Sequence, residues 1–437
     1  MPHSPSRRTF LQYSLAAGVT APLAVTRTTP AASDQVHIGC VGVGGKGWTD
    51  MNEASTGHQI VAICDVDEDR LAKASEAFPQ AKRYTDWRRL MEQNDLDAVT
   101  VSTPDHMHAA ITFTAIELGK HTYTQKPLTH SVYEARMLAE AAARQGVVTQ
   151  MGIQHHSNTF FRTGVHLVQQ GTIGKIREAH VWTDRPVGVW EQDMERPTAN
   201  VAPPESLHWD QWLGVAPTRP FVVNSYHPFK WRGFWDFGTG ALGDMGCHAM
   251  DPVVSALELG PPSTISYNGP IPNSETGPQS SMIQYGFPGT RWTPDQFKMV
   301  WYDGAILPPR RLFDVADDSQ LEKNGILLIG DNGQLLLNYS KPPILLPHGD
   351  FADTKVAALP ADNHYAQWTD AILGRGKPSC PFSYSGPLTE TVLLGNVALR
   401  SGQRIDWDSE NLVAVDAPET AGLIRREYRD GWRIEGL

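Results

Sequence analysis

Short apolar runs alternate with helix-compatible segments over the first third of the chain. The apolar runs predict buried strands, at residues 36–41, 60–64, 97–102, 121–123 and 147–151. Between them, residues 70–78, 85–91, 109–118 and 132–145 have the spacing and end signals of helices. Strands that alternate with helices favour a parallel sheet covered by helices on both faces. The pattern therefore predicts an α/β fold with a doubly wound parallel sheet over residues 34–152.

The pattern changes after residue 152. Strands are expected at residues 176–182, 281–285, 297–302, 325–330 and 334–338, with a hairpin turn at residues 331–333. Helices are expected at residues 161–170, 366–373 and 388–401, and from Gly240 onward. From residue 265 the alternation is more typical of an antiparallel sheet. Residues 153–437 are therefore expected to form a second α/β domain with a mostly antiparallel sheet.

The first 33 residues have the features of a targeting signal. Arg7 and Arg8 are followed by Phe10 and Leu11, and a mildly apolar stretch rich in Ala and Gly follows at residues 13–25. This order matches the twin-arginine export signal, which is read as an address and not used as an anchor. We therefore expect an exported, periplasmic protein. The alternative is an N-terminal tail with a chance arginine pair.

Composition and charge exclude several classes of protein. The formal net charge is -11 at pH 7, and no basic run occurs beyond Arg7 and Arg8, which argues against a nucleic-acid-binding surface. No run approaches the roughly 20 apolar residues of a membrane-spanning helix. The four cysteines are not spaced as metal ligands. We expect no nucleic-acid partner, no membrane span and no metal ion.

The first apolar run ends in a glycine-rich turn with the sequence GVGGKG. Gly42 is placed to make the tight turn, Gly44 to let the backbone approach a pyrophosphate, and Gly47 to let the next helix pack closely. Gly45 lies in the same turn. The helix N-terminus that follows offers free N–H groups and a positive dipole end to phosphates. The turn predicts a Rossmann-type dinucleotide site.

A carboxylate follows at the end of the second apolar run. Asp65 lies 18 residues after Gly47, where an acid hydrogen-bonds the ribose 2′-OH of NAD. A carboxylate there repels the 2′-phosphate of NADP, and the acidic residues 67–69 add to that repulsion. The sequence therefore favours NAD as the cofactor, whereas the nearby Arg70 keeps NADP as an alternative.

Four motifs occur in a fixed order along the first domain: the glycine turn, then Thr103-Pro104-Asp105-x-x-His108, Gly119-Lys120-His121 and Gln125-Lys126-Pro127. This series resembles that of the Gfo/Idh/MocA oxidoreductases, the family of glucose–fructose oxidoreductase and inositol dehydrogenase. The resemblance covers essentially the whole chain after the signal. It implies a Rossmann domain and a C-terminal α/β domain whose open sheet often mediates oligomers, so we expect a homo-oligomer, a dimer or tetramer, through that sheet.

The resemblance assigns the cofactor site and one catalytic group. Thr103, Pro104, His108 and Gln125 are expected to contact the cofactor, as is Lys126, which is also expected to act on the substrate. Two positions depart from the family pattern, because Gln125 replaces a glutamate and Asp105 replaces an asparagine. One hypothesis is that losing a negative neighbour makes Lys126 harder to protonate. The alternative is a neutral replacement beside the site.

A second set of polar residues follows Gly240. If this segment is helical, Asp244 and His248 lie one turn apart on one face, and Asp251 follows on the same side. A carboxylate beside an imidazole can fix the tautomer that a general base needs. The pair resembles the family's Asp-x-x-x-His, which lies opposite the lysine. The alternative is a polar pair that only stabilises the helix.

Residues 153–240 are rich in aromatic and histidine residues. We expect Gln154 and His155, directly after the last strand of the first domain, to project toward the cofactor and contact substrate. Trp231 and Arg232 are expected to contact substrate as well, since aromatic faces with polar neighbours stack on sugar rings. The alternative for each tryptophan is a place in the core.

Three functions are consistent with these patterns. The first is an exported NAD-binding oxidoreductase acting on a sugar, polyol or related carbohydrate: His248 takes the hydroxyl proton, Lys126 polarises the oxygen, and Asp244 orients His248. The second is an NAD-retaining, redox-neutral glycosidase or eliminase, which needs a further base such as His155, His156 or Asp105. The third is a non-catalytic sugar-binding protein.

Overall fold

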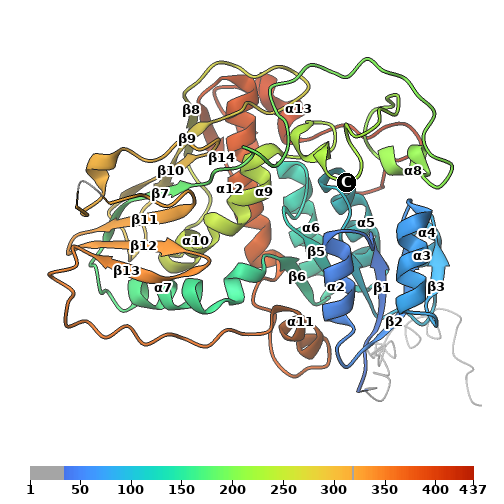
Figure 1. The fold of residues 1–437 in the computed structure, drawn as a ribbon, viewed down its shortest axis with the longest axis horizontal. Coiled ribbons are helices and arrows are strands. Elements are labelled where there is room, and N and C mark those ends of the chain that lie inside the picture. The colour runs from blue at the N-terminus through green and yellow to red at the C-terminus, as the bar shows by residue number, and fades with distance from the viewer. Residues whose placement is uncertain (1–33, 317–318) are drawn as a thin grey trace, which may run out of the picture. The chain divides into compact units, whose positions relative to one another are not determined.

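The computed structural model describes residues 34–316 and 319–437. The predicted export signal at residues 1–33 lies outside the described residues. Residues Gln35–Leu437 form one compact unit, in which a parallel sheet and a larger mixed sheet are joined by helices (Figure 1).

The first sheet has six parallel strands in the order β3-β2-β1-β4-β5-β6, which is the Rossmann order. Its strands are β1 (His37–Val41), β2 (Gln59–Cys64), β3 (Lys82–Tyr84), β4 (Ala98–Val101), β5 (His121–Gln125) and β6 (Thr149–Gly152). The central strands are buried on both faces, which explains their continuous apolar runs. The predicted doubly wound sheet is confirmed.

Helices connect these strands in the predicted alternation. They are α2 (Lys46–Ala54), α3 (Glu68–Ala77), α4 (Trp87–Met91), α5 (Asp105–Glu117) and α6 (Val132–Gln145). Their ends carry the expected local signals. Ser131 and Glu134 form a capping box at the start of α6, and Gly146 ends that helix with a positive φ of 64°.

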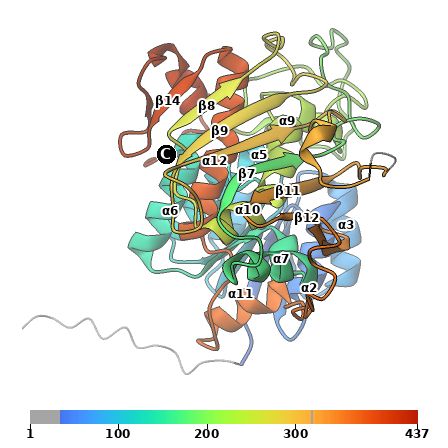
Figure 2. The ribbon, with the colours of Figure 1, turned by 90° about the vertical axis from the view of Figure 1, so that its left-hand side faces the viewer.

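The second sheet has nine strands in the order β13-β12-β11-β7-β10-β9-β8-β14-β15. They are β7 (Ile176–Trp182), β8 (Thr264–Tyr267), β9 (Met282–Pro288), β10 (Gln296–Tyr302), β11 (Gly325–Gly330), β12 (Gln334–Asn338), β13 (Lys341–Leu346), β14 (Ile405–Asp408) and β15 (Val413–Ala414). All neighbouring pairs are antiparallel except β7 and β10. Figure 2 shows one face of this sheet, with α10 and α12 behind it. The predicted mostly antiparallel sheet is confirmed.

The second half of the chain also supplies helices that pack on the inner face of this sheet or on the first domain. They are α7 (Thr159–Gln169), α8 (Trp209–Leu213), α9 (Gly240–Ala249), α10 (Asp251–Leu257), α11 (His364–Ile372), α12 (Phe382–Ser401) and α13 (Ala421–Ile424), with short 3-10 turns at Gln154–Ser157, Lys230–Gly233, Arg310–Leu312 and Pro418–Thr420. Helix α12 contacts α6 of the first domain as well as α9 and β8 of the second.

Several helix boundaries differ from the expectation, and α5, for example, begins at Asp105, four residues before the predicted start. Helix α12 starts six residues before the predicted start, with Pro387 inside it. Its first turn is fixed by tertiary contacts, since Phe382 is fully buried and its N–H donates to Thr149 Oγ1 at 2.9 Å. Asp251 opens the separate helix α10, so it does not extend the helix of His248 as expected.

The described residues contain no helix long and apolar enough to cross a membrane. Within the same residues, no group of three or more His, Cys, Asp or Glu side chains is placed to hold a metal ion.

Candidate active site

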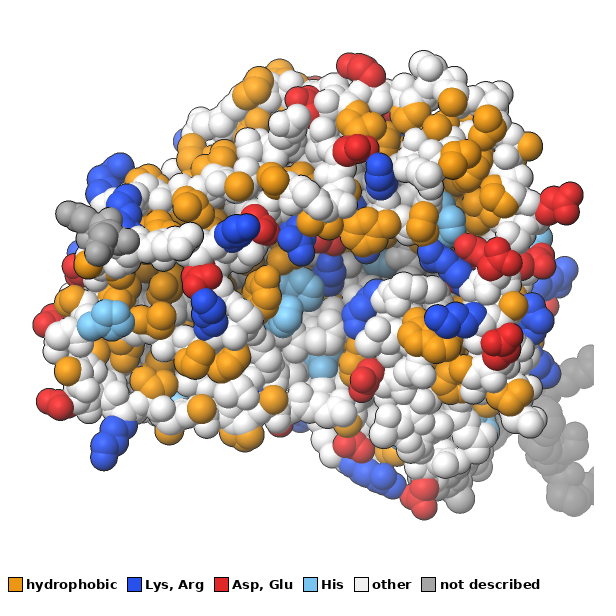
Figure 3. All heavy atoms as spheres, viewed as in Figure 1, with side chains coloured by type: hydrophobic (Ala, Val, Ile, Leu, Met, Phe, Trp, Pro, Cys, Tyr) orange, Lys and Arg blue, Asp and Glu red, His pale blue; other side chains and the backbone are white. Residues whose placement is uncertain are grey.

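A cavity of about 570 Å³ lies at the carboxyl ends of the strands of the first sheet. Figure 3 shows a hollow in the surface where histidine and basic side chains gather. Parts of both halves of the chain line the cavity, including Gly42, Gly44, Gly45, Lys46, Asp65, Arg70, Thr103, Pro104, Asp105, Gln125, Lys126, Gln211, Trp212, His227, Phe229, Trp231, Arg232 and Asp244. Ligands of such sheets bind at this edge.

The glycine turn has the backbone geometry that a dinucleotide needs. Gly42 has a φ of 80°, and a Cβ there would lie 2.7 Å from Ser102 O. A Cβ on Gly47 would lie 1.9 Å from Gly42 O, so only glycine lets α2 start this close to β1. Gly45 precedes α2 without a side-chain cap, which leaves the helix's first N–H groups available to phosphates.

Asp65 lies at the predicted place but already has hydrogen-bond partners. Its carboxylate accepts from Val43 N at 2.9 Å and from Asp67 N at 3.0 Å, and burial raises its pKa. It therefore fixes the glycine turn as well as lining the cavity. The Arg70 side chain lies over Gly44, because a Cβ on Gly44 would meet Arg70 Cδ at 2.4 Å. The sequence alone did not place Arg70 at the phosphate end.

The Thr103-Pro104 loop supplies a further observation that fits NAD. Thr103 Oγ1 is buried without a partner among the described residues, so a polar atom is available to a ligand. His108 is buried between two loops that line the site, with ring nitrogens 2.8 Å from Pro127 O and 2.8 Å from Thr103 O. Burial lowers the His108 pKa to about 4. His108 thus holds the Thr103-Pro104 loop against the Gln125-Lys126-Pro127 loop and does not itself line the cavity.

Gln125 contacts a buried carboxylate that sequence analysis missed. Its Nε2 donates to Asp50 Oδ2 at 2.8 Å, and Asp50 is fully buried. Asp50 Oδ1 accepts from Lys46 at 2.8 Å and from the Tyr365 hydroxyl at 2.7 Å. The i,i+4 spacing of Lys46 and Asp50 was a usable signal, whereas nothing in the sequence links Tyr365 to this site.

Lys126, Asp244 and Arg232 meet at the other end of the cavity. Lys126 Nζ donates to Asp244 Oδ1 at 2.8 Å and to Asp244 O at 2.7 Å, and Arg232 Nε donates to the same Oδ1 at 3.3 Å. All three side chains are only 15–20% exposed. The two cations hold the pKa of Asp244 below its usual value although burial opposes them. The Asp244 carboxylate is thus bound to Lys126 and Arg232, and the role expected for it in orienting His248 stays a prediction.

His248 lies beside this group without a fixed partner. Its Nδ1 is buried and has no hydrogen-bond partner among the described residues. Its ring packs edge-on against His155, with centroids 4.9 Å apart, and His155 stacks on Tyr339. Burial, and next the charge of Lys126, lower the pKa of His248 well below 6.5. The imidazole is therefore neutral at pH 7 and able to accept a proton.

The predicted substrate residues occupy two environments. Trp231 and Arg232 line the cavity, and Trp231 is 7% exposed, so it belongs to the core and the site at once. Gln154 and His155 are not among the lining residues. The amide of Gln154 donates to the hydroxyl of Tyr123 at 2.6 Å, which fixes the start of the second half against β5.

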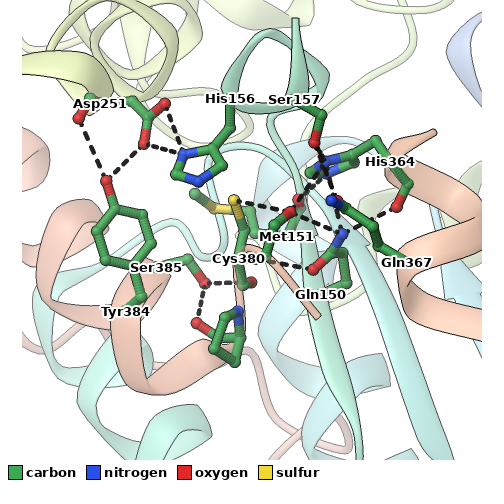
Figure 4. A network of polar contacts seen from close by, with 12 residues as sticks. Gln150, Met151, His156, Ser157, Asp251, His364, Gln367, Cys380, Tyr384 and Ser385 are labelled. Carbon is green, nitrogen blue, oxygen red and sulfur yellow. Dashed lines mark hydrogen bonds and ion pairs between the residues drawn. The ribbon is translucent and has the colours of Figure 1, made fainter. Parts of the chain in front are cut away.

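His156, one of the candidate additional bases, belongs to a structural network (Figure 4). Its Nδ1 lies 2.9 Å from Asp251 Oδ1, and Asp251 also accepts from the Tyr384 hydroxyl. Asp251 raises the pKa of His156 well above 6.5 against the opposing effect of burial. Figure 4 shows Cys380 close to His156. These contacts join the end of β6 to α10 and α12 and leave His156 protonated.

Residues 203–228, which we call the strap, cover the cofactor end of the cavity. Leu207 bridges to Asp67, and His208 N donates to Val66 O at 2.9 Å. His227 Nε2 lies 2.8 Å from Asp67 Oδ2. The strap is thus attached to the segment that follows Asp65, the residue expected to bind the ribose.

Comparison with known proteins identifies both halves. Residues 36–153 match the model for the NAD-binding Rossmann fold of the Gfo/Idh/MocA oxidoreductase family, and residues 181–275 match the model for its C-terminal α/β domain. The predicted NAD-binding domain is confirmed. The boundary predicted at residue 152 stays a prediction.

Curated relatives and solved structures agree with this assignment. Levoglucosan dehydrogenase from Pseudarthrobacter phenanthrenivorans is 24% identical over 43% of this chain and 40% of its own length. A glycosyl hydrolase family 109 protein from Shewanella sp. is 29% identical over 33% of this chain and 34% of its own. The chain thus matches less than half the length of these relatives. The WlbA dehydrogenase from Bordetella pertussis, solved with NADH and UDP-GlcNAcA, superposes with a TM-score of 0.59 at 16% identity, over 86% of this chain and 99% of its own. With both domain models matched in order, the chain belongs to the Gfo/Idh/MocA family.

Proposed function

We propose that the protein is an NAD-dependent oxidoreductase that acts on a CH–OH group of a sugar, polyol or related carbohydrate. The observation that carries this proposal is the placement of Lys126 and Asp244 in one cavity with the glycine turn. Bound NAD would accept the hydride. The names of the relatives, one a sugar dehydrogenase and one a glycosidase, support a carbohydrate substrate.

Side chains of the chain itself would transfer the proton and bind the substrate oxygen and ring. Neutral His248, with an unpartnered Nδ1, is suited to take the hydroxyl proton. Lys126 carries a charge stabilised by Asp244 and polarises the same oxygen. Asp244 acts through Lys126 in this scheme. Aromatic surface from Trp231 and Phe229 is available to the sugar ring.

Steady-state oxidation of a carbohydrate panel, followed by NADH formation, tests this function. We expect Lys126→Met and His248→Gln each to reduce kcat by roughly 100-fold or more while NAD binding persists. Lys341→Met, an exposed lysine paired with Glu322, is the matched control and should keep full activity. Full activity in both site variants would favour the non-catalytic, sugar-binding alternative.

A second function, redox-neutral glycoside cleavage or elimination with retained NAD, is favoured by the strap. Its contacts with Val66, Asp67 and Glu68 hinder release of a nucleotide beneath it. The further base that this cycle needs has two remaining candidates. Asp105 has a pKa raised to about 7 by burial, and His155 has a pKa lowered by burial. Protonated, Asp251-bound His156 is the weaker choice.

Denaturing the purified protein and measuring the released nucleotide separates the two functions. Near-stoichiometric NAD, together with cleavage of a glycoside in the absence of added NAD, supports the redox-neutral cycle. A nucleotide-free protein that forms NADH only with added NAD supports the simple dehydrogenase.

We further propose export by the twin-arginine route and assembly into a homo-oligomer through the nine-stranded sheet. Cell fractionation of the chain and of its Arg7→Lys/Arg8→Lys variant tests export, since the variant should stay in the cytoplasm. Light scattering after size exclusion tests assembly, and a monomeric mass would contradict it.

A further inference from the structure

Two aromatic rings hold the Arg232 guanidinium in one orientation inside the cavity. Its Cζ lies 4.2 Å from the ring centroid of Phe229 and 4.3 Å from that of Trp231. Nη1 donates to Phe229 O at 3.1 Å, and the side chain is 20% exposed. A guanidinium fixed in this way loses little further entropy when it binds a ligand.

The same guanidinium is short of negative charge. Its one ion-pair partner among the described residues is Asp244, at 3.3 Å, and that carboxylate is also bound by Lys126 at the shorter distance of 2.8 Å. Arg232 Nη2 makes no hydrogen bond within the described chain. Two cations thus share one carboxylate in a largely buried place, where an uncompensated charge is costly.

The other charged groups at this end do not remove the surplus. Lys46 is neutralised by Asp50 at 2.8 Å. His155 and His248 have pKa values lowered by burial and are neutral at pH 7. Asp105 accepts from Thr239 Oγ1 at 2.7 Å, and burial raises its pKa to about 7, so it supplies only part of a negative charge at neutral pH.

We propose that the substrate is an acidic carbohydrate, a sugar or polyol that carries a carboxylate, and that Arg232 binds this carboxylate through Nη2. This inference rests on the proposed function and names its substrate class. A planar carboxylate matches the donors of a guanidinium, and its single negative charge offsets the positive charge that the partly ionised Asp105 leaves uncompensated. A phosphate group brings nearly two. The cofactor's phosphates belong to the opposite end, where Arg70 lies over Gly44.

Matched probes test the charge separately from the sugar. Binding to the NADH-loaded protein is measured by calorimetry for D-glucuronate, D-galacturonate and D-mannuronate, for their methyl esters, for the parent hexoses and for glucose 6-phosphate. We expect at least one uronate to bind roughly 10-fold or more tightly than its ester and its hexose. Arg232→Gln should abolish this difference, and Arg404→Gln, which removes an exposed arginine outside the cavity, should keep it.

Each other outcome overturns the inference. The inference fails if the methyl esters or hexoses bind as tightly as the uronates, or if glucose 6-phosphate binds more tightly. It also fails if Arg232→Gln still prefers uronates to their esters, or if no uronate binds. Turnover separates this result from the proposed function. NADH formation from neutral sugars alone would reject the acidic substrate and keep the oxidoreductase. Arg232-dependent uronate binding without any NADH formation would keep the carboxylate site and reject the oxidoreductase.

Discussion

Gln125 lies with its amide against the fully buried Asp50, and this contact gives a physical reason for the departure from the family's glutamate. A glutamate at position 125 would place two carboxylates in contact, and only one of them could ionise easily. A carboxylate is therefore present next to position 125, on Asp50. This explanation competes with the hypothesis that Gln125 tunes the protonation of Lys126.

We expect Gln125→Glu to weaken NAD binding and to lower stability by about 1–3 kcal/mol at pH 8, because the new carboxylate faces Asp50. The defect should shrink at pH 5. Adding Asp50→Asn should restore both properties, since the amide and carboxylate then exchange places. Titration with NAD and thermal unfolding of the single and double variants measure this. A shifted pH–activity profile in Gln125→Glu that Asp50→Asn leaves unchanged would instead favour the tuning hypothesis.

Asp105 should make the protein less stable as the pH rises from about 5 to 8. Burial raises its pKa from 3.8 to about 7, so the folded chain holds a proton that the unfolded chain has released, and this contribution to stability is lost as the pH passes the folded pKa. The change amounts to about 2–3 kcal/mol. Asp105→Asn keeps an acceptor for Thr239 and should reduce this pH dependence.

Denaturant unfolding at pH 5 and pH 8 measures the effect of Asp105. The control is Asp331→Asn, a half-exposed carboxylate paired with Arg177. Equal stabilisation by Asp105→Asn at both pH values would show that Asp105 is ionised throughout this range.

At the scale of elements, the strap should control how fast the nucleotide leaves. His227→Leu removes the 2.8 Å contact with Asp67 but keeps the N-cap that Asp67 provides to α3. We expect NADH release to become roughly 10-fold faster. This corresponds to a loss of about 1.4 kcal/mol in the free energy that holds the strap closed. A stopped-flow chase of bound NADH with excess NAD measures this rate. His348→Leu, at an exposed histidine, is the control, and equal rates in both variants would mean that the strap does not gate release.

Elements set by local signals could be predicted from the sequence, whereas contacts across the chain could not. The strands of the first sheet carry continuous apolar runs, and the glycine turn has a fixed spacing, so both were found in place. Lys126 and Asp244 were found through motifs, but their pairing depends on how α9 packs against the β5 loop. Tyr365 and His227 reach the site from segments without motifs, and only the fold brings them there.

At the scale of the whole molecule, α12 joins the two halves. Arg136 of α6 makes two hydrogen bonds of 2.8 Å with Glu390 of α12, and the Glu390 side chain is 3% exposed. The hydroxyl of Tyr428 adds a 2.7 Å bond to Glu134. With residues 35–437 in one compact unit, the two sheets should unfold together.

Calorimetry of the NAD-free protein should therefore show one transition, which NAD shifts upward as a whole. Glu390→Leu leaves Arg136 without its buried partner and should cost about 2–3 kcal/mol, less than for a fully buried pair because Arg136 is 23% exposed. The transition should stay single and move to lower temperature. Two separated transitions, with NAD raising only one of them, would instead mean that the Rossmann sheet folds independently of the nine-stranded sheet.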